Sequence, residues 1–244
     1  MKPIMLTVSM ESKRMLKDKY FLVFSLLLPF VLYSLFTYIN RGQAIGQIDF
    51  DYYFLISMTC YSLVVTSVQT FGIQIMYDRK QTWMAYLFTH PISAAQYFAA
   101  RMITQLLLNT LIIAFFFFIS NAWKQFDRPL GEWLVISLWL LMGSILFLAI
   151  GILIAQTKKL QTASVTANIL VLTFAILGGL WMPLETFPNW VQAIGEWLPS
   201  HIYAQGAWRI AATGSLAFSN IILLVCYFLV SFIGVVFLQY KQRS

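Results

Sequence analysis

Long apolar stretches alternate with short polar ones along the whole chain. An α-helix needs about 20 mostly apolar residues to cross the hydrocarbon layer of a membrane. Six stretches fit such helices: Phe21–Ile39, Tyr52–Met76, Ile103–Ala122, Trp133–Ala155, Val165–Trp181 and Ser219–Leu238. The runs are continuous, whereas strands of a transmembrane barrel alternate over about 10 residues. The pattern therefore predicts an all-α integral membrane protein with six transmembrane helices, in a single domain over residues 1–244.

The composition excludes most other classes of protein. Hydrophobic residues make up 60% of the chain and charged residues 10%, compared with about 25% charged residues in a typical globular protein. So few charges cannot cover a water-exposed surface for a chain of 244 residues. Soluble globular, disordered, collagen-like and disulfide-scaffold proteins are excluded on this ground.

The distribution of positive charge predicts the orientation of the chain. Six crossings place both termini on the same side of the membrane. Twelve of the 16 Lys and Arg residues fall on that side, and the opposite side holds Arg41, Lys124, Arg128 and Arg209. Because Lys and Arg accumulate on cytoplasmic loops, we expect both termini to be cytoplasmic. The net charge of +7 then reflects topology, and no nucleic-acid partner is expected.

Two segments on the cytoplasmic side have amphipathic patterns. In residues 1–20, apolar and basic positions interleave, which favours a helix at the membrane interface; a charged tail that only sets topology is the alternative. In residues 77–101, the apolar positions Trp83, Met84, Leu87 and Phe88 recur as on one face of a short helix. That helix could dock a soluble partner or rest on lipid, and the pattern favours neither.

The outer segment between the fifth and sixth stretches, residues 182–218, is apolar and rich in proline. Pro183, Pro188 and Pro199 interrupt it, and proline inside a helix removes a backbone hydrogen bond. The segment is too apolar for a solvated loop and too interrupted for another crossing. We expect two short helices that re-enter the outer leaflet, because irregular backbone at membrane depth is tolerated where it packs against protein or faces water.

Catalytic and coupling chemistry is missing from the predicted spans. All nine carboxylates and all 16 basic residues lie outside them, although proton relays and ion sites usually need intramembrane charges. The chain has no H-E-x-x-H motif and no phosphate-binding loop of the G-x-x-x-x-G-K-[ST] type. We therefore predict no catalytic, metal-binding or cofactor-binding residues, and expect that any uphill transport takes its energy from another polypeptide.

Several predicted spans nevertheless contain polar residues: Thr66, Gln69, Gln74, Gln105, Asn109, Thr166 and Asn168. Hydrogen bonding between helices is the commoner role of such residues. Lining a transport pathway is the functional alternative, and the two roles are compatible. The spacing of Gly151 and Ala155, and of Ala163 and Ala167, indicates close helix packing.

This layout resembles the type-2 ATP-binding-cassette (ABC) exporter permeases of bacteria over essentially the whole chain. The stretches that carry the resemblance are Tyr77–Pro91, Gly178–Pro183, Phe187–Trp190 and Leu198–Pro199. In that family a permease pairs with a second permease, and two cytoplasmic ATPase subunits bind below the pair. The resemblance implies a plasma-membrane location, contact with membrane lipid, and ATP and Mg²⁺ bound only on the ATPase partner.

The resemblance also implies roles for individual residues. A coupling helix over residues 78–89 would contact the ATPase through Asp78, Arg79, Trp83, Tyr86 and Leu87. Residues lining the pathway would be Gln69, Gln74 and Asn168. The outer gate would contain Pro183, Glu185, Pro188 and Pro199.

The expected function is therefore that of a permease subunit in an ATP-driven exporter, without enzymatic activity of its own. A non-transport membrane scaffold or sensor is the alternative. The apolar, aromatic-rich spans favour a lipidic or amphipathic cargo over a sugar or a metal ion, and leave drugs, peptides, lipids and glycan precursors open.

Overall fold

The computed structural model describes residues 8–12, 19–81 and 94–241. Residues 8–12 are helical. The further elements, in chain order, are α2 Lys19–Ile39, β1 Ala44–Ile45, β2 Ile48–Asp49, α3 Phe50–Val64, the π-helical η1 Val65–Thr70, α4 Phe71–Arg79, α6 Ala94–Lys124, α7 Leu130–Ile154, α8 Leu160–Ile176, the 3-10 turn η2 Leu184–Thr186, α9 Asn189–Gly195, α10 Pro199–Thr213 and α11 Phe218–Lys241.

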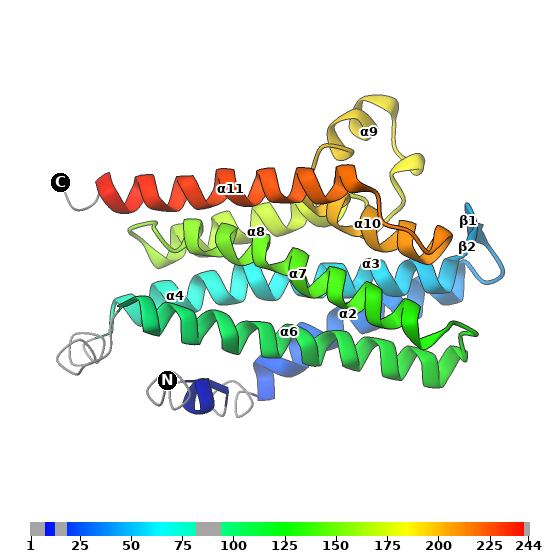
Figure 1. The fold of residues 1–244 in the computed structure, drawn as a ribbon, viewed down its shortest axis with the longest axis horizontal. Coiled ribbons are helices and arrows are strands. Elements are labelled where there is room, and N and C mark those ends of the chain that lie inside the picture. The colour runs from blue at the N-terminus through cyan, green and yellow to red at the C-terminus, as the bar shows by residue number, and fades with distance from the viewer. Residues whose placement is uncertain (1–7, 13–18, 82–93, 242–244) are drawn as a thin grey trace.

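The long helices run side by side along the long axis of the molecule (Figure 1). Residues 8–12, the end of α4 and the end of α11 lie at one end of the bundle, which we call the terminal end. The β1–β2 hairpin lies at the opposite end, the hairpin end. Both ends of the described chain therefore lie at the same end of the bundle. Which side of the membrane that end faces stays a prediction.

Within the described residues, four helical rods are long and apolar enough to cross a membrane: Phe50–Arg79, Gln96–Lys124, Leu130–Ile154 and Phe218–Leu238. Two shorter apolar helices accompany them, Leu26–Ile39 and Leu160–Ile176. These findings confirm an all-α, multi-pass membrane protein. The count of six crossings stays a prediction, because it depends on the two shorter helices.

The fifth helix ends earlier than its apolar run suggested. The predicted span continued to Trp181, whereas α8 ends at Ile176. Gly179 follows with a φ of 76°, and the Leu180 N–H donates to the carbonyl of Ala175 at 3.0 Å. This is the usual way in which a left-handed glycine closes a helix. A glycine therefore ends α8, several residues before the first of the prolines.

The second helical rod, α3–η1–α4, forms the centre of the bundle. In the apolar stretch of this rod 83% is buried inside the bundle, whereas in the apolar stretch of α11 only 11% is buried. Helices within a membrane bundle approach through small and polar residues, and lipid-facing helices can be apolar all round. This explains why the very apolar α11 lies at the periphery.

The central rod and α7 approach each other closely at two glycines. A Cβ atom on Gly72 would lie 2.7 Å from the carbonyl oxygen of Gly151, and one on Gly151 would lie 2.5 Å from that of Ser67. Real Cβ atoms do not come so close, so these glycines set the distance between the two backbones. The packing role predicted for Gly151 is confirmed, and Ala163 and Ala167 are both fully buried.

The outer segment has more structure than the sequence indicated. It comprises η2, the short α9 and the 15-residue α10. The helix α10 is largely buried and packs against α3, α7 and α11, while α9 stands out from the side of the bundle near the hairpin end (Figure 1). The β1–β2 hairpin, with Ala44 opposite Asp49, was not foreseen. Re-entry of α9 and α10 into the outer leaflet stays a prediction.

Candidate functional site

A buried cluster of charged residues joins three parts of the chain at the terminal end. Asp78, in the last turn of α4, is 1% exposed. Its Oδ2 atom lies 3.1 Å from Nη2 of Arg101 in α6 and accepts a hydrogen bond from the Tyr97 hydroxyl at 2.7 Å. The end of the second span is thereby fixed to the start of α6.

Arg101 is the hub of this cluster, which we call the Asp78–Arg101 cluster. It is 4% exposed. Its Nη1 atom pairs with the carboxylate of Glu11, and its Nη2 atom donates to Oε1 of Gln74 at 3.1 Å. A single guanidinium therefore holds residues 8–12, α4 and α6 together. Its planar arrangement of N–H donors suits arginine to such sites.

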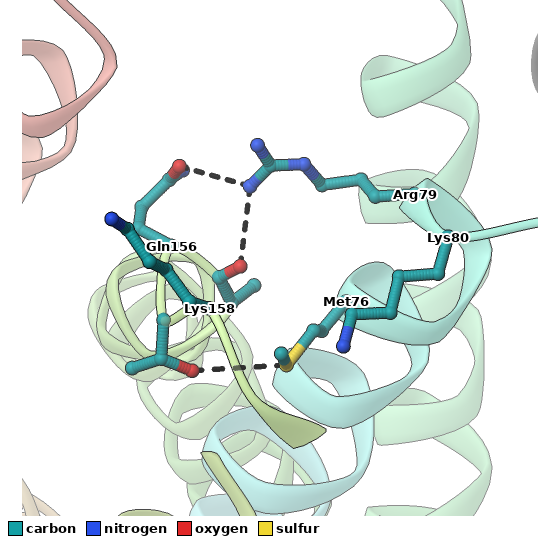
Figure 2. A pocket seen from close by; sticks show the side chains of 7 residues that line it. Met76, Arg79, Lys80, Gln156 and Lys158 are labelled. Carbon is teal, nitrogen blue, oxygen red and sulfur yellow. Dashed lines mark hydrogen bonds between the residues drawn. The ribbon is translucent and has the colours of Figure 1, made fainter. Parts of the chain in front are cut away.

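Arg79 points away from this cluster toward the α7–α8 connection. Its Nη1 atom donates to the Gln156 side-chain oxygen at 2.9 Å and to the Ala155 carbonyl at 3.2 Å, as Figure 2 shows. Successive residues on an α-helix point about 100° apart. The adjacent residues Asp78 and Arg79 can therefore hold different neighbours of the central rod.

A positively charged pocket of about 390 Å³ opens beside Arg79. Lys80 and Lys158 border it together with Arg79 and Gln156 (Figure 2), and none of the described residues that line it carries a carboxylate. Clefts lined by one sign of charge concentrate the electrostatic potential. The pocket therefore attracts anionic groups at the terminal end.

The coupling residues predicted from the sequence divide into two groups. Asp78 and Arg79 lie in α4 and make the contacts given above. Trp83, Tyr86 and Leu87 fall within residues 82–93 and so lie outside the described residues. Of the helix predicted over residues 78–89, the structure describes residues 78–81, and α4 ends at Arg79.

The pathway residues lie in three different environments. Gln74 faces the Asp78–Arg101 cluster through its contact with Arg101. Gln69 is half-buried in η1, and Asn168 is exposed on the surface of α8. Their role in transport stays a prediction.

Another span residue, Asn109, forms a buried polar network with the neighbouring helices. Its Nδ2 atom donates to the Ser67 hydroxyl at 3.2 Å and to the Ser144 hydroxyl at 3.0 Å. Gln105 donates to its Oδ1 atom at 3.1 Å. The hydrogen-bonding role expected of Asn109 is therefore confirmed.

In the outer segment the prolines lie at the starts of helical elements. Pro183 precedes η2, Pro188 precedes α9, and Pro199 is the first residue of α10, a position where proline is well tolerated. Glu185, in η2, is exposed. In α10, burial lowers the pKa of the His201 imidazole.

Two charged residues of the site were not singled out in the sequence. Arg101 and Glu11 lie outside the apolar stretches and carry no motif. The helix α6 begins at Ala94, well before the predicted start at Ile103, and this extension carries Arg101 into the bundle. In the described part of the chain, no three His, Cys, Asp or Glu residues are placed to hold a metal ion.

Two comparisons with known proteins bear on the whole arrangement. The family described as ABC-2 type transporter matches residues 4–210. A curated protein of Bacillus subtilis (strain 168), "Putative transport permease YvfS", is 34% identical over 234 residues, which cover 96% of each chain. With a family match over most of its length and a relative aligned over nearly all of it, the chain belongs to the ABC-2 type transporter family and is a multi-pass transport permease.

Proposed function

We propose that this chain is the membrane-spanning subunit of an ATP-driven exporter in the bacterial plasma membrane. It would form half of a translocation pathway together with a second copy of itself or a related permease. Separate cytoplasmic ATPase subunits would bind ATP and Mg²⁺ and supply the energy. Family membership supports this proposal, as does the lack of a phosphate-binding loop in the sequence.

The observation that carries the proposal is the double attachment at the end of α4. Asp78 is fixed to α6 through Arg101, and Arg79 is fixed to the α7–α8 connection. The chain continues from α4 directly into residues 82–93, which contain the predicted ATPase contacts Trp83, Tyr86 and Leu87. A force applied to this segment would act first on Asp78 and Arg79, and through them on several helices.

The buried ion pairs would make this transmission stiff. Removing one partner of a buried ion pair costs about 3–5 kcal/mol, because the other charge is left unpaired. Asp78 and Arg101 would therefore move together rather than separate. The central rod, α6 and the α7–α8 connection would shift as one body between inward-facing and outward-facing states, which is one of the usual forms of such transitions.

The surface of α8 supports the placement of the pathway. Thr162, Thr166 and Asn168 are exposed on this helix, and polar side chains are unfavourable against lipid. The helix packs beside α4 and η1, so Gln69 lies in a neighbouring element. We infer that α8 and the central rod face the second permease across a polar pathway, with Gln69, Gln74 and Asn168 near the cargo.

The outer segment would close this pathway at the hairpin end. Pro183, Pro188 and Pro199 fix the turns between its helical elements, and α10 is held deep in the bundle by the hydrogen bond from the Tyr203 hydroxyl to the Leu140 carbonyl. Glu185 is exposed and would face the exit. We assign this segment to the outer gate.

The test is to co-express the chain with a candidate P-loop ATPase from its source genome and to isolate the complex in detergent. Substitution of both Trp83 and Leu87 by Asp should abolish co-purification of the ATPase, because two charges would enter the proposed contact. The matched control is Thr82→Asp with Thr89→Asp, which adds the same charge on the opposite face of the predicted helix. Equal ATPase retention in the two double variants would contradict the proposal.

A further inference from the structure

An apolar groove runs between α7 and α11 on the outside of the bundle. It has a volume of about 410 Å³. The residues that line it include Trp139, Met142 and Leu146 of α7, and Ile221, Val225 and Phe228 of α11. Both helices are long and apolar enough to cross the membrane, so the groove opens toward hydrocarbon rather than water.

Arg209, in α10, closely follows two residues that contact the helices forming this groove. Three residues before it, Gly206 packs against the indole of Trp139 in α7. Four residues before it, Gln205 accepts a hydrogen bond from Asn220 of α11 at 3.0 Å. Residues three and four apart share one face of a helix, so Arg209 lies on the face of α10 that bridges α7 and α11.

The direction of α10 places Arg209 closer to the hairpin end of the bundle than the groove. Farther along α10, the Ala211 carbonyl accepts a hydrogen bond from Arg128 at 3.2 Å, and Arg128 belongs to the connection between α6 and α7 at the hairpin end. Arg209 is therefore about one helical turn closer to the membrane surface than Gly206 and Trp139. The apolar groove extends from this point toward the membrane interior.

Arg209 differs from the other cations at the hairpin end. Lys124 pairs with Asp51 at 2.7 Å, Arg128 bonds to Ala211, and Arg41 stacks over the ring of Tyr38 at 4.7 Å. The Arg209 side chain is exposed and makes no hydrogen bond or ion pair with any residue in the described ranges.

We propose that the groove and Arg209 together form a binding site for a phospholipid of the leaflet at the hairpin end. One acyl chain occupies the groove, where only apolar side chains and Gly143 meet it. The phosphate binds the Arg209 guanidinium, whose donors match a phosphate in a bidentate arrangement. This site lies on the opposite side of α7 from Ser144, the residue of that helix in the Asn109 network, and does not depend on the proposed transport cycle.

Native mass spectrometry of the detergent-purified chain, titrated with phosphatidylglycerol, tests both halves of the site. Arg209→Gln should weaken the tightest binding event by about tenfold or more, as expected for the loss of a charge-assisted contact. Arg41→Gln, at another exposed outer arginine, is the control and should bind as wild type. Diacylglycerol with the same acyl chains should bind wild type no better than it binds Arg209→Gln.

The groove is tested with a second pair of variants on α11. Val225→Trp fills the groove from a position that is 50% exposed, and Val236→Trp adds the same bulk at a position that is 52% exposed and outside the groove. We expect weaker phosphatidylglycerol binding only for Val225→Trp. Melting temperatures should match wild type in all four variants, because all four positions are exposed. Wild-type affinity in either Arg209→Gln or Val225→Trp would overturn the proposal.

Discussion

Asp78 and Arg101 form a buried ion pair, with 3.1 Å between Oδ2 and Nη2, at the end of the bundle where the second and third spans meet. Neither residue lies in an apolar stretch of the sequence. The pair fixes the start of α6 to the end of the central rod, beside the segment proposed to contact the ATPase. Loss of the pair should therefore affect both stability and coupling.

Replacement of Arg101 by Met should lower the free energy of unfolding by about 3–5 kcal/mol, because the buried carboxylates of Asp78 and Glu11 would both lose their ion pair with its guanidinium. Denaturant titration in detergent measures this change. Lys80→Met removes an exposed cation from the same end of the bundle and should alter stability by less than about 0.5 kcal/mol. An equal effect of the two substitutions would contradict the structural role of Arg101.

A methyl group at Gly151 should separate α7 from the central rod. Gly151→Ala places a Cβ atom 2.5 Å from the Ser67 carbonyl oxygen, and we expect a destabilisation of about 1–3 kcal/mol from the forced backbone shift. Gly131 lies near the start of the same helix and has nothing within 4 Å of an added Cβ. Gly131→Ala should be neutral or slightly stabilising, and a melting temperature for Gly151→Ala at or above that of Gly131→Ala would refute the close approach.

Substitutions of two asparagines should distinguish a role in helix packing from a role in transport. Asn109→Leu removes the amide that donates to the buried Ser67 and Ser144 hydroxyls and should cost about 1–2 kcal/mol of stability. Asn168→Leu, on the exposed face of α8, should leave the isolated chain as stable as wild type. If Asn168 lines the pathway, its substitution should change ATP-dependent transport or ATPase stimulation, and a stable variant with unchanged activity would remove it from the pathway.

The predicted orientation can be tested by labelling single cysteines with a membrane-impermeant thiol reagent in a Cys60→Ser, Cys226→Ser background. A cysteine at Ser215, in the connection between α10 and α11, should react in intact cells. A cysteine at Ser244 should react only after permeabilisation, because both termini are expected on the cytoplasmic side. Reaction of both in intact cells would invalidate the six-crossing topology.

The apolar pattern predicted the helices well because length and hydropathy are local properties. The first predicted span, Phe21–Ile39, differs from α2 by two residues at its start and ends at the same residue. The end of α8 was misplaced because Gly179 acts through its left-handed backbone, a geometric effect that an apolar count does not detect. Apolarity also gave no guide to position in the bundle, since the very apolar α11 lies outside.

The candidate site was only partly predictable for a related reason. Asp78 and Arg79 were found through their place in a family-like stretch. Arg101 and Glu11 are 90 residues apart in the sequence, and only the folded bundle brings them together. Periodicity along one helix carries no information about such a contact. The groove below Arg209 likewise depends on how α7, α10 and α11 cross.

The central claim, that an ATPase drives this permease through residues 82–93, is tested most directly by site-specific photocrosslinking in the native membrane. A benzophenone amino acid at position 87 should give a light-dependent adduct containing a P-loop ATPase, identified by mass spectrometry. The same probe at position 236, on the exposed surface of α11, should give none. Absence of an ATPase adduct from position 87, in native membranes that contain the intact chain, would contradict the account.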